Sequence, residues 1–204
     1  MIKRVILVGG INRLTKEIII KWTLMNIFNT LNANDILFIR EIAEPLELSS
    51  CKNREIKVHN EYITSGCFCC TSKIDLENIL NEYKNEDSIN FIVLEIPITA
   101  DLLSVRKIIE TYFEKIEYYI FFTIELNEIM ILLESFKDLI IRNTRFADFL
   151  VLFNYDNVHF KVPKMLDFEL KGKQKLFLEI LGYNIELFYD KINEIKFRKL
   201  IKEL

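Results

Sequence analysis

Apolar residues occur along this chain in short continuous runs, separated by longer stretches in which they recur at helical spacing. The first run, Lys3–Val8, is rich in β-branched residues and ends in Gly9-Gly10, which is typical of a buried parallel strand entering a turn. Similar runs predict further strands at Asp35–Ile39, Ile89–Leu94, Tyr118–Thr123, Phe149–Phe153 and Ile185–Phe188. Apolar residues three or four positions apart predict helices at about Thr15–Leu31, Asp75–Tyr83, Leu102–Phe113, Leu126–Ile141, Gln174–Leu181 and Ile192–Lys202.

This alternation of strands and helices predicts an α/β fold with a mostly parallel sheet and helices on both faces. Ligands in such folds bind at the carboxyl ends of the strands, so the loops after Val8, Ile39, Leu94 and Phe153 are the informative ones. The chain has no Ser- or Pro-rich linker and no internal repeat. We therefore expect residues 1–204 to form a single domain.

Composition narrows the class of protein further. The chain has 204 residues, of which 50% are hydrophobic and 28% charged, and this excludes collagen-like and disordered classes. Its 27 Lys and Arg residues against 30 Asp and Glu residues give a net charge of −3, so we expect no nucleic-acid partner. The first apolar stretch is too short for a signal peptide, so we expect none, and carboxylates at Glu125 and Glu128 interrupt the most apolar later stretch. We expect a cytoplasmic protein without a membrane partner.

Three of the four cysteines lie in one short stretch, Cys67-Phe68-Cys69-Cys70. A disulfide framework would scatter its cysteines, whereas this crowding in a reducing compartment predicts a soft metal ligand set. Thiolates bind zinc at about 2.3 Å in tetrahedral geometry. Cys67 and Cys69 occupy alternate backbone positions, so their two sulfurs can converge on one ion, and Cys70 can supply a third.

Other residues are candidates for a fourth ligand, namely Cys51, with Glu41 or His59 as substitutes from nearby segments. Two other interpretations of the cysteines stay open. Free cysteines are often small buried hydrophobic residues, and adjacent Cys69 and Cys70 could form a redox pair.

The segment Thr64-Ser65-Gly66-Cys67-Phe68-Cys69-Cys70-Thr71, followed by a predicted helix, resembles the Gly-Cys-x-Cys-Cys element of the CobW family of P-loop GTPases. Members of that family act as metallochaperones and metal-insertion factors, chiefly for zinc and cobalt. The resemblance implies a P-loop NTPase-like fold, a bound zinc or cobalt ion, GTP with magnesium, and a client metalloprotein as partner.

Several loops extend the resemblance over nearly the whole chain. Glu41 matches the glutamate of an Asn-Glu-Phe-Gly stretch after the second strand, although Arg40 and Ala43 depart from it. Glu95, Ala100 and Asp101 match a Glu-Thr-x-Gly-x-Ala-Asp-Pro segment, with Ile98 in place of the glycine. Asn154 matches the asparagine of a guanine-reading stretch, where Tyr155 stands in place of a lysine. The family's smaller C-terminal domain is expected to be missing.

The phosphate-binding motif is also altered. Gly10 and Lys16 match it, but Thr15 replaces its last glycine and Glu17 replaces the Ser or Thr that binds magnesium. Thr15 is β-branched, so its backbone would be strained at a positive φ. The carboxylate of Glu17 would be repelled by a polyphosphate by about 1–4 kcal/mol at 4 Å. Because all of the nucleotide-binding motifs carry substitutions, we expect that efficient GTP hydrolysis has been lost.

The sequence therefore predicts a CobW-like, metallochaperone-type protein that binds zinc or cobalt and has degenerate GTP-binding motifs. The candidate nucleotide-contacting residues are Gly10, Thr15, Lys16, Glu17, Glu95 and Asn154, and no catalytic residue is assigned. Two alternatives remain open. One is a pseudo-GTPase interaction module with a structural metal site, and the other is an active GTPase with a divergent phosphate loop.

Overall fold

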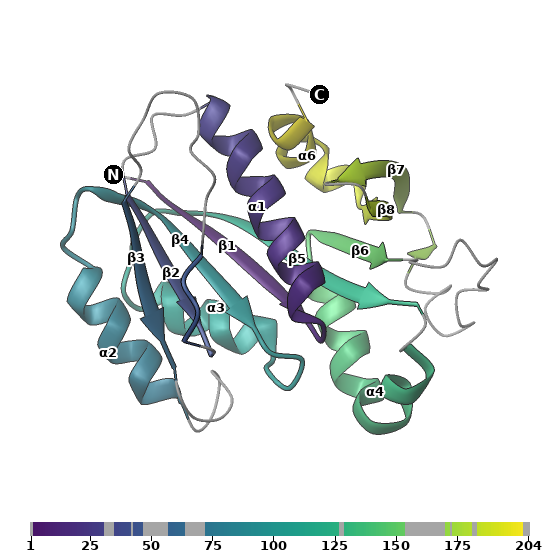
Figure 1. Cartoon of the computed structure of the whole chain (residues 1–204), viewed down its shortest axis with the longest axis horizontal. Coiled ribbons are helices and arrows are strands. Elements are labelled where there is room, and N and C mark those ends of the chain that lie inside the picture. The colour runs from purple at the N-terminus through teal and green to yellow at the C-terminus, as the bar shows by residue number, and fades with distance from the viewer. Residues whose placement is uncertain are drawn as a thin grey trace.

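The computed structural model describes residues 2–30, 35–41, 43–46, 57–63, 72–126, 129–153, 170–171, 173–180 and 183–201. These residues form an α/β structure built on an eight-stranded sheet with helices on both faces (Figure 1). The strands are β1 (Lys3–Gly10), β2 (Asp35–Arg40), β3 (Lys57–Tyr62), β4 (Ile89–Ile96), β5 (Ile116–Glu125), β6 (Phe149–Phe153), β7 (Gln174–Ile180) and β8 (Tyr183–Tyr189). The helices are α1 (Arg13–Thr30), α2 (Lys73–Tyr83), α3 (Leu102–Glu110), α4 (Ile129–Phe146), the short 3₁₀ helix η1 (Lys191–Asn193) and α6 (Glu194–Ile201).

The sheet has the strand order β3-β2-β4-β1-β5-β6-β8-β7. The first six strands in this order pair in parallel, and β8 and β7 add an antiparallel pair at one side. The chain leaves β1 in one direction through α1 and later crosses the sheet in the other direction through α2, α3 and α4. In such folds ligands bind where connections leave neighbouring strands in opposite directions, and here this point lies at the carboxyl ends of β4, β1 and β5.

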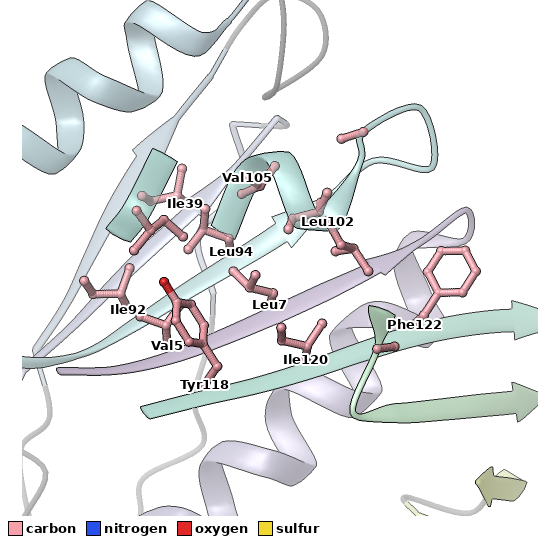
Figure 2. Packing of buried hydrophobic residues seen from close by; sticks show 14 of the residues in the cluster. Val5, Leu7, Ile39, Ile92, Leu94, Leu102, Val105, Tyr118, Ile120 and Phe122 are labelled. Atoms are coloured by element: carbon pink, nitrogen blue, oxygen red, sulfur yellow. The ribbon is translucent and has the colours of Figure 1, made fainter. Parts of the chain in front are cut away.

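The alternation of side chains along each strand divides the core into two layers. Leu7 and the apolar side chains on the same face of the sheet pack against α2, α3 and α4. Ile6 and the apolar side chains on the opposite face pack against α1. Figure 2 shows Leu102 and Val105 of α3 lying over Leu7 and Leu94 of the two central strands. The fold predicted from sequence, a mostly parallel sheet covered on both faces, is confirmed.

One predicted helix is wrong, because Gln174–Ile180 forms strand β7 instead of part of a helix over Gln174–Leu181. Its apolar residues fit a helical face and an alternating strand equally well over so short a segment. Antiparallel pairing with β8 from Gln174↔Tyr189 to Ile180↔Tyr183 decides in favour of the strand. Strand β3 was not predicted, because its sequence is mostly polar and its side chains are half-buried or exposed.

No helix within the described ranges is both long and apolar enough to cross a bilayer.

Candidate functional site at the carboxyl edge of the sheet

Six predicted site residues lie at or beside the carboxyl edge of the sheet. Gly10 ends β1 and Glu95 lies near the end of β4, while Glu41 directly follows β2. Thr15, Lys16 and Glu17 lie in the first turns of α1, which starts at the same edge. His59, the other substitute ligand, lies on β3 with its Nε2 3.5 Å from Oδ2 of Asp35. The other candidates are outside the described residues, and these are Cys51, Cys67, Cys69, Cys70 and Asn154.

Lys16 is held by groups on β4. Its Nζ lies 3.3 Å from Oε1 of Glu95, and it also donates a hydrogen bond to the carbonyl of Ile96 at 3.3 Å. The Lys16 and Glu95 side chains are only 7% and 6% exposed. Helix α1 therefore places the Lys16 amine at the carboxyl edge of the sheet, where its charge is paired with the carboxylate of Glu95 on β4.

Arg40 completes this arrangement from the other side of Glu95. Strands β2 and β4 pair in parallel with Ile39 opposite Leu94, so Arg40 and Glu95 lie beside one another under α1. Arg40 is 1% exposed, and its guanidinium forms an ion pair with Glu95 and donates to the carbonyl of Glu44 at 3.0 Å. We call Lys16, Arg40 and Glu95 the edge ion cluster.

More charged residues surround the edge ion cluster toward solvent. Glu17 lies 3.9 Å from Arg40 and accepts a hydrogen bond from Lys21 at 2.7 Å. Arg13 pairs with Glu44 and lies 3.7 Å from Glu17. Cations and anions thus alternate through this region, and each carboxylate named here has a basic partner.

Burial and these charges act on the ionisation of the site. Burial lowers the pKa of Lys16, and the nearby Glu95 carboxylate opposes that shift. Partial desolvation raises the pKa of Glu41, although the charge of Lys16 pulls it back down. For Glu17, burial alone would raise the pKa, but the hydrogen bond from Lys21 and the surrounding cations outweigh it and lower the pKa.

Gly10 has a packing role that its sequence context did not predict. Its φ is +147°, and a Cβ added there would lie 2.0 Å from Oγ1 of Thr123 and 2.7 Å from the backbone oxygen of Thr123. Gly10 pairs with Thr123 in the β1–β5 ladder. The absence of a side chain is therefore required by close contact with β5, because only glycine allows this approach at this φ.

The connection from β1 to α1 is short. Only Ile11 and Asn12 separate Gly10 from Arg13, the first residue of the helix. Asn12 caps the helix, because its Oδ1 accepts from the Leu14 amide at 2.8 Å and its carbonyl accepts from the Lys16 amide at 3.2 Å. Thr15 is buried within the first turn, with its hydroxyl 3.3 Å from that of Thr123.

These features fit a bound triphosphate poorly. A phosphate loop needs several loop residues whose amides surround the phosphate and a lysine that reaches it. Residues 13 to 15 are already helical, and the Lys16 amine is bound to Glu95 and Ile96. The Nε of Arg40 is a buried donor of the edge ion cluster, and it has no acceptor among the described residues.

Asn143 and Asp148 have structural partners near this edge, and one of these partners is Ala100 of the predicted motif after β4. The Asn143 side chain accepts from the Leu102 amide at 3.1 Å and donates to the Ala100 carbonyl at 3.1 Å, which ties the loop after β4 to α4. Asp148 accepts from the Ile120 amide at 3.0 Å and from Lys196 of α6 at 2.8 Å. Ala100 and Asp148 thus take part in loop and helix packing.

Away from the edge, a cavity of about 460 Å³ lies between α3 and α4, on the opposite face of the sheet from α1. Its lining combines apolar and charged side chains, namely Leu103, Asp138, Ile141, Arg142, Arg145 and Phe146. Within the described ranges no three His, Cys, Asp or Glu residues are grouped so that they could hold a metal ion. The four cysteines all fall outside those ranges.

Sequence reasoning missed Arg40 as a site residue. It was noted only as a departure from a motif, yet it is the buried partner that Glu95 shares with Lys16. A signal was present, because Arg40 and Glu95 are opposite charges at or next to the end of a buried apolar strand.

Comparison of the chain with protein-family models, curated proteins and solved structures found no match.

Proposed function

We propose that this protein is a metallochaperone-type protein that binds a soft divalent ion, zinc or cobalt, through Cys67, Cys69 and Cys70. In this proposal the domain resembles CobW-type P-loop proteins and has diminished nucleotide chemistry. The metal is its cargo, and a client metalloprotein is its partner. Thiolates are soft ligands, and they bind such ions in preference to harder cations.

The observation that carries the proposal is that Ile63, just before the cysteine segment, is hydrogen-bonded to a residue of the edge ion cluster. Ile63 is the last described residue before that segment, and its amide donates to the carbonyl of Arg40 at 2.8 Å. Arg40 in turn pairs with Glu95. Cys67 follows Ile63 by four positions. The chain therefore enters the cysteine segment at the carboxyl edge of the sheet, four residues before Cys67 and beside Arg40.

The chemistry of the cysteines sets the expected pH dependence. Thiols must lose their protons to bind the metal, so affinity falls as the solution becomes acidic. Glu41 lies next to Arg40 in sequence and is the carboxylate available as an additional ligand, with Cys51 as the alternative.

The state of Lys16 supports a reduced role for nucleotide. A lysine that contacts phosphate oxygens has to give up its other partners, and here those are a buried carboxylate and a backbone carbonyl. Leaving Glu95 with one fewer cation in a buried site costs free energy. We therefore expect weak binding of Mg-GTP and metal binding that does not depend on it.

Zinc stoichiometry and affinity test the metal site. The wild-type protein, purified without a metal-affinity tag, is titrated with zinc in competition with a chromophoric chelator. We expect about one high-affinity zinc per chain, and its loss in the double variant Cys67→Ser/Cys69→Ser. Cys51→Ser, which removes one thiol outside the cluster, identifies the additional ligand, because zinc affinity falls if Cys51 is that ligand and stays unchanged if Glu41 is. Unchanged zinc binding in the double variant overturns the proposal.

Chelation separates cargo from structural metal. If the ion is cargo, the demetallated protein keeps its fold and takes up zinc again rapidly. A large fall in melting temperature on chelation, with no exchange of metal, instead favours the pseudo-GTPase module with a structural site. The active-GTPase alternative predicts that Mg-GTP stabilises the fold and that Lys16→Ala removes this stabilisation.

A further inference from the structure

We propose that the cavity between α3 and α4 binds a small amphipathic carboxylate. The charged end of this ligand lies at Arg142 and Arg145, and its apolar chain or ring lies against Leu103, Ile141 and Phe146. The inference does not depend on the metal site, because all six lining residues belong to α3 and α4 and lie within the described ranges.

The first observation is the size and setting of the cavity. Its volume of about 460 Å³ falls within the range of about 300–1,000 Å³ that is usual for small-molecule sites. Leu103 reaches it from the first turn of α3, and the other lining residues come from the C-terminal half of α4. Both helices cover the same face of the sheet (Figure 1).

The walls of the cavity are held by contacts within the protein. Asn143 is 1% exposed, and its side chain joins α4 to the start of α3 through hydrogen bonds with the Leu102 amide and the Ala100 carbonyl. The guanidinium of Arg106 lies 5.8 Å from the centroid of the Phe146 ring. A site that is formed in advance loses less conformational freedom when a ligand binds.

Three apolar side chains supply one part of the recognition. Leu103, Ile141 and Phe146 are each only partly buried, whereas Leu102 and Ile140 beside them lie in the core. The three thus keep apolar surface that lines the cavity. Covering this surface with an apolar chain or ring removes it from water, which favours binding.

Charge supplies the other part of the recognition. Two arginines and one aspartate line the cavity, so the lining has a net charge of +1, although the whole chain has a net charge of −3. Arg142 and Arg145 are three positions apart on α4, which makes them neighbours on one side of the helix. The planar guanidinium of arginine matches the two oxygens of a carboxylate.

Arg142 has donors available for such a ligand. Its side chain is 56% exposed, and its Nη1 lies 4.0 Å from Oδ2 of Asp101, which is too long for a hydrogen bond. That oxygen of Asp101 accepts from the Ser104 hydroxyl at 2.5 Å instead. Asp138 lies one helical turn before Arg142, about 6 Å along the axis, and its charge favours a ligand with one negative charge over one with more.

Octanoate tests the class of ligand. The amide resonances of the isotope-labelled full chain are followed by NMR during titration with octanoate, with acetate and with octanol. We expect saturable shifts with octanoate at Leu103 and from Ile141 to Phe146. Acetate carries only the charge and octanol only the apolar chain, so each should bind with a dissociation constant at least about tenfold higher.

Arg142→Gln tests the charged end of the site. It should raise the dissociation constant for octanoate at least about tenfold, because the carboxylate loses a charged donor. Arg198→Gln is the matched control, since it removes an arginine of α6 that is 68% exposed and changes the net charge equally. It should leave the affinity unchanged. Asp138→Asn removes the negative charge of the lining and should tighten octanoate binding about twofold.

Opposite effects of Arg142→Gln and Asp138→Asn would exclude a loss of folding as their cause, because unfolding weakens binding in both variants. Unchanged amide resonances in the strands verify that each variant is folded. The proposal is overturned if octanoate gives no saturable shifts, if the shifts are centred outside α3 and α4, or if wild type and Arg142→Gln bind octanoate equally.

Discussion

The Nζ of Lys16 lies 3.3 Å from Oε1 of Glu95, and both side chains are more than nine-tenths buried. Arg40 approaches the same carboxylate from β2, so one buried anion is shared by two buried cations. Such clusters contribute little net stability when complete, but a buried charge that loses its partner is costly. The fold of the carboxyl edge therefore depends on Glu95.

Replacing Glu95 by Gln should destabilise the protein more than any exposed carboxylate does. The change leaves Lys16 and Arg40 buried without their anion, and we expect a loss of about 3–5 kcal/mol in the free energy of unfolding. Urea denaturation measures it. Glu44→Gln is the matched control, because it breaks an exposed pair with Arg13 and should cost less than about 1 kcal/mol. Equal losses in the two variants would show that the cluster carries no special weight.

The ionisation of Lys16 should make stability depend on pH in the alkaline range. Burial lowers its pKa in the folded chain, so between that value and the unfolded value of about 10.4 the unfolded chain binds more protons. Stability contributed by this residue therefore rises with pH through that window.

Lys16→Met lacks this effect, so the difference in free energy of unfolding between wild type and variant should move in favour of the wild type as the pH rises toward about 10.4, the unfolded pKa of lysine. Burial also raises the pKa of Tyr118 and Tyr119, but both proteins share these groups and their contribution cancels in the difference. Parallel stability profiles for the two proteins would contradict the prediction.

Gly10→Ala should be severely destabilising. The added Cβ meets both the hydroxyl and the backbone oxygen of Thr123, and alanine is strained at φ +147°. We expect a loss of about 2–5 kcal/mol in thermal or urea unfolding. Gly9→Ala is the control, because its Cβ would meet only the ends of Leu102 and Phe122 at 3.1 Å and 3.2 Å. A milder effect at Gly10 than at Gly9 would refute the packing explanation.

The fold was largely predictable because the central strands are buried on both faces and read as continuous apolar runs. Strand β7 was mistaken for a helix, since a short segment with many apolar residues fits both periods until its pairing with β8 is known. Strand β3 lacks the apolar pattern, because it lies at the other end of the sheet and its side chains are partly solvated.

The site was predictable only as separate residues. Lys16 and Glu95 were singled out from two distant motifs, but their pairing depends on the register of β1, β4 and β2, which no local pattern contains. Arg40 belongs to the same cluster for the same reason. The early start of α1 follows from Asn12, whose side chain caps the helix at Leu14.

The central claim is that the domain binds a soft metal through its cysteines while Lys16 stays engaged with Glu95. The most direct test is the melting temperature of tag-free, chelator-treated protein with zinc, with Mg-GTP and with both, for the wild type and Cys67→Ser/Cys69→Ser. The account predicts a rise with zinc that the double variant loses, and no rise with Mg-GTP alone. A rise with Mg-GTP that Lys16→Ala abolishes, together with no response to zinc, would contradict it.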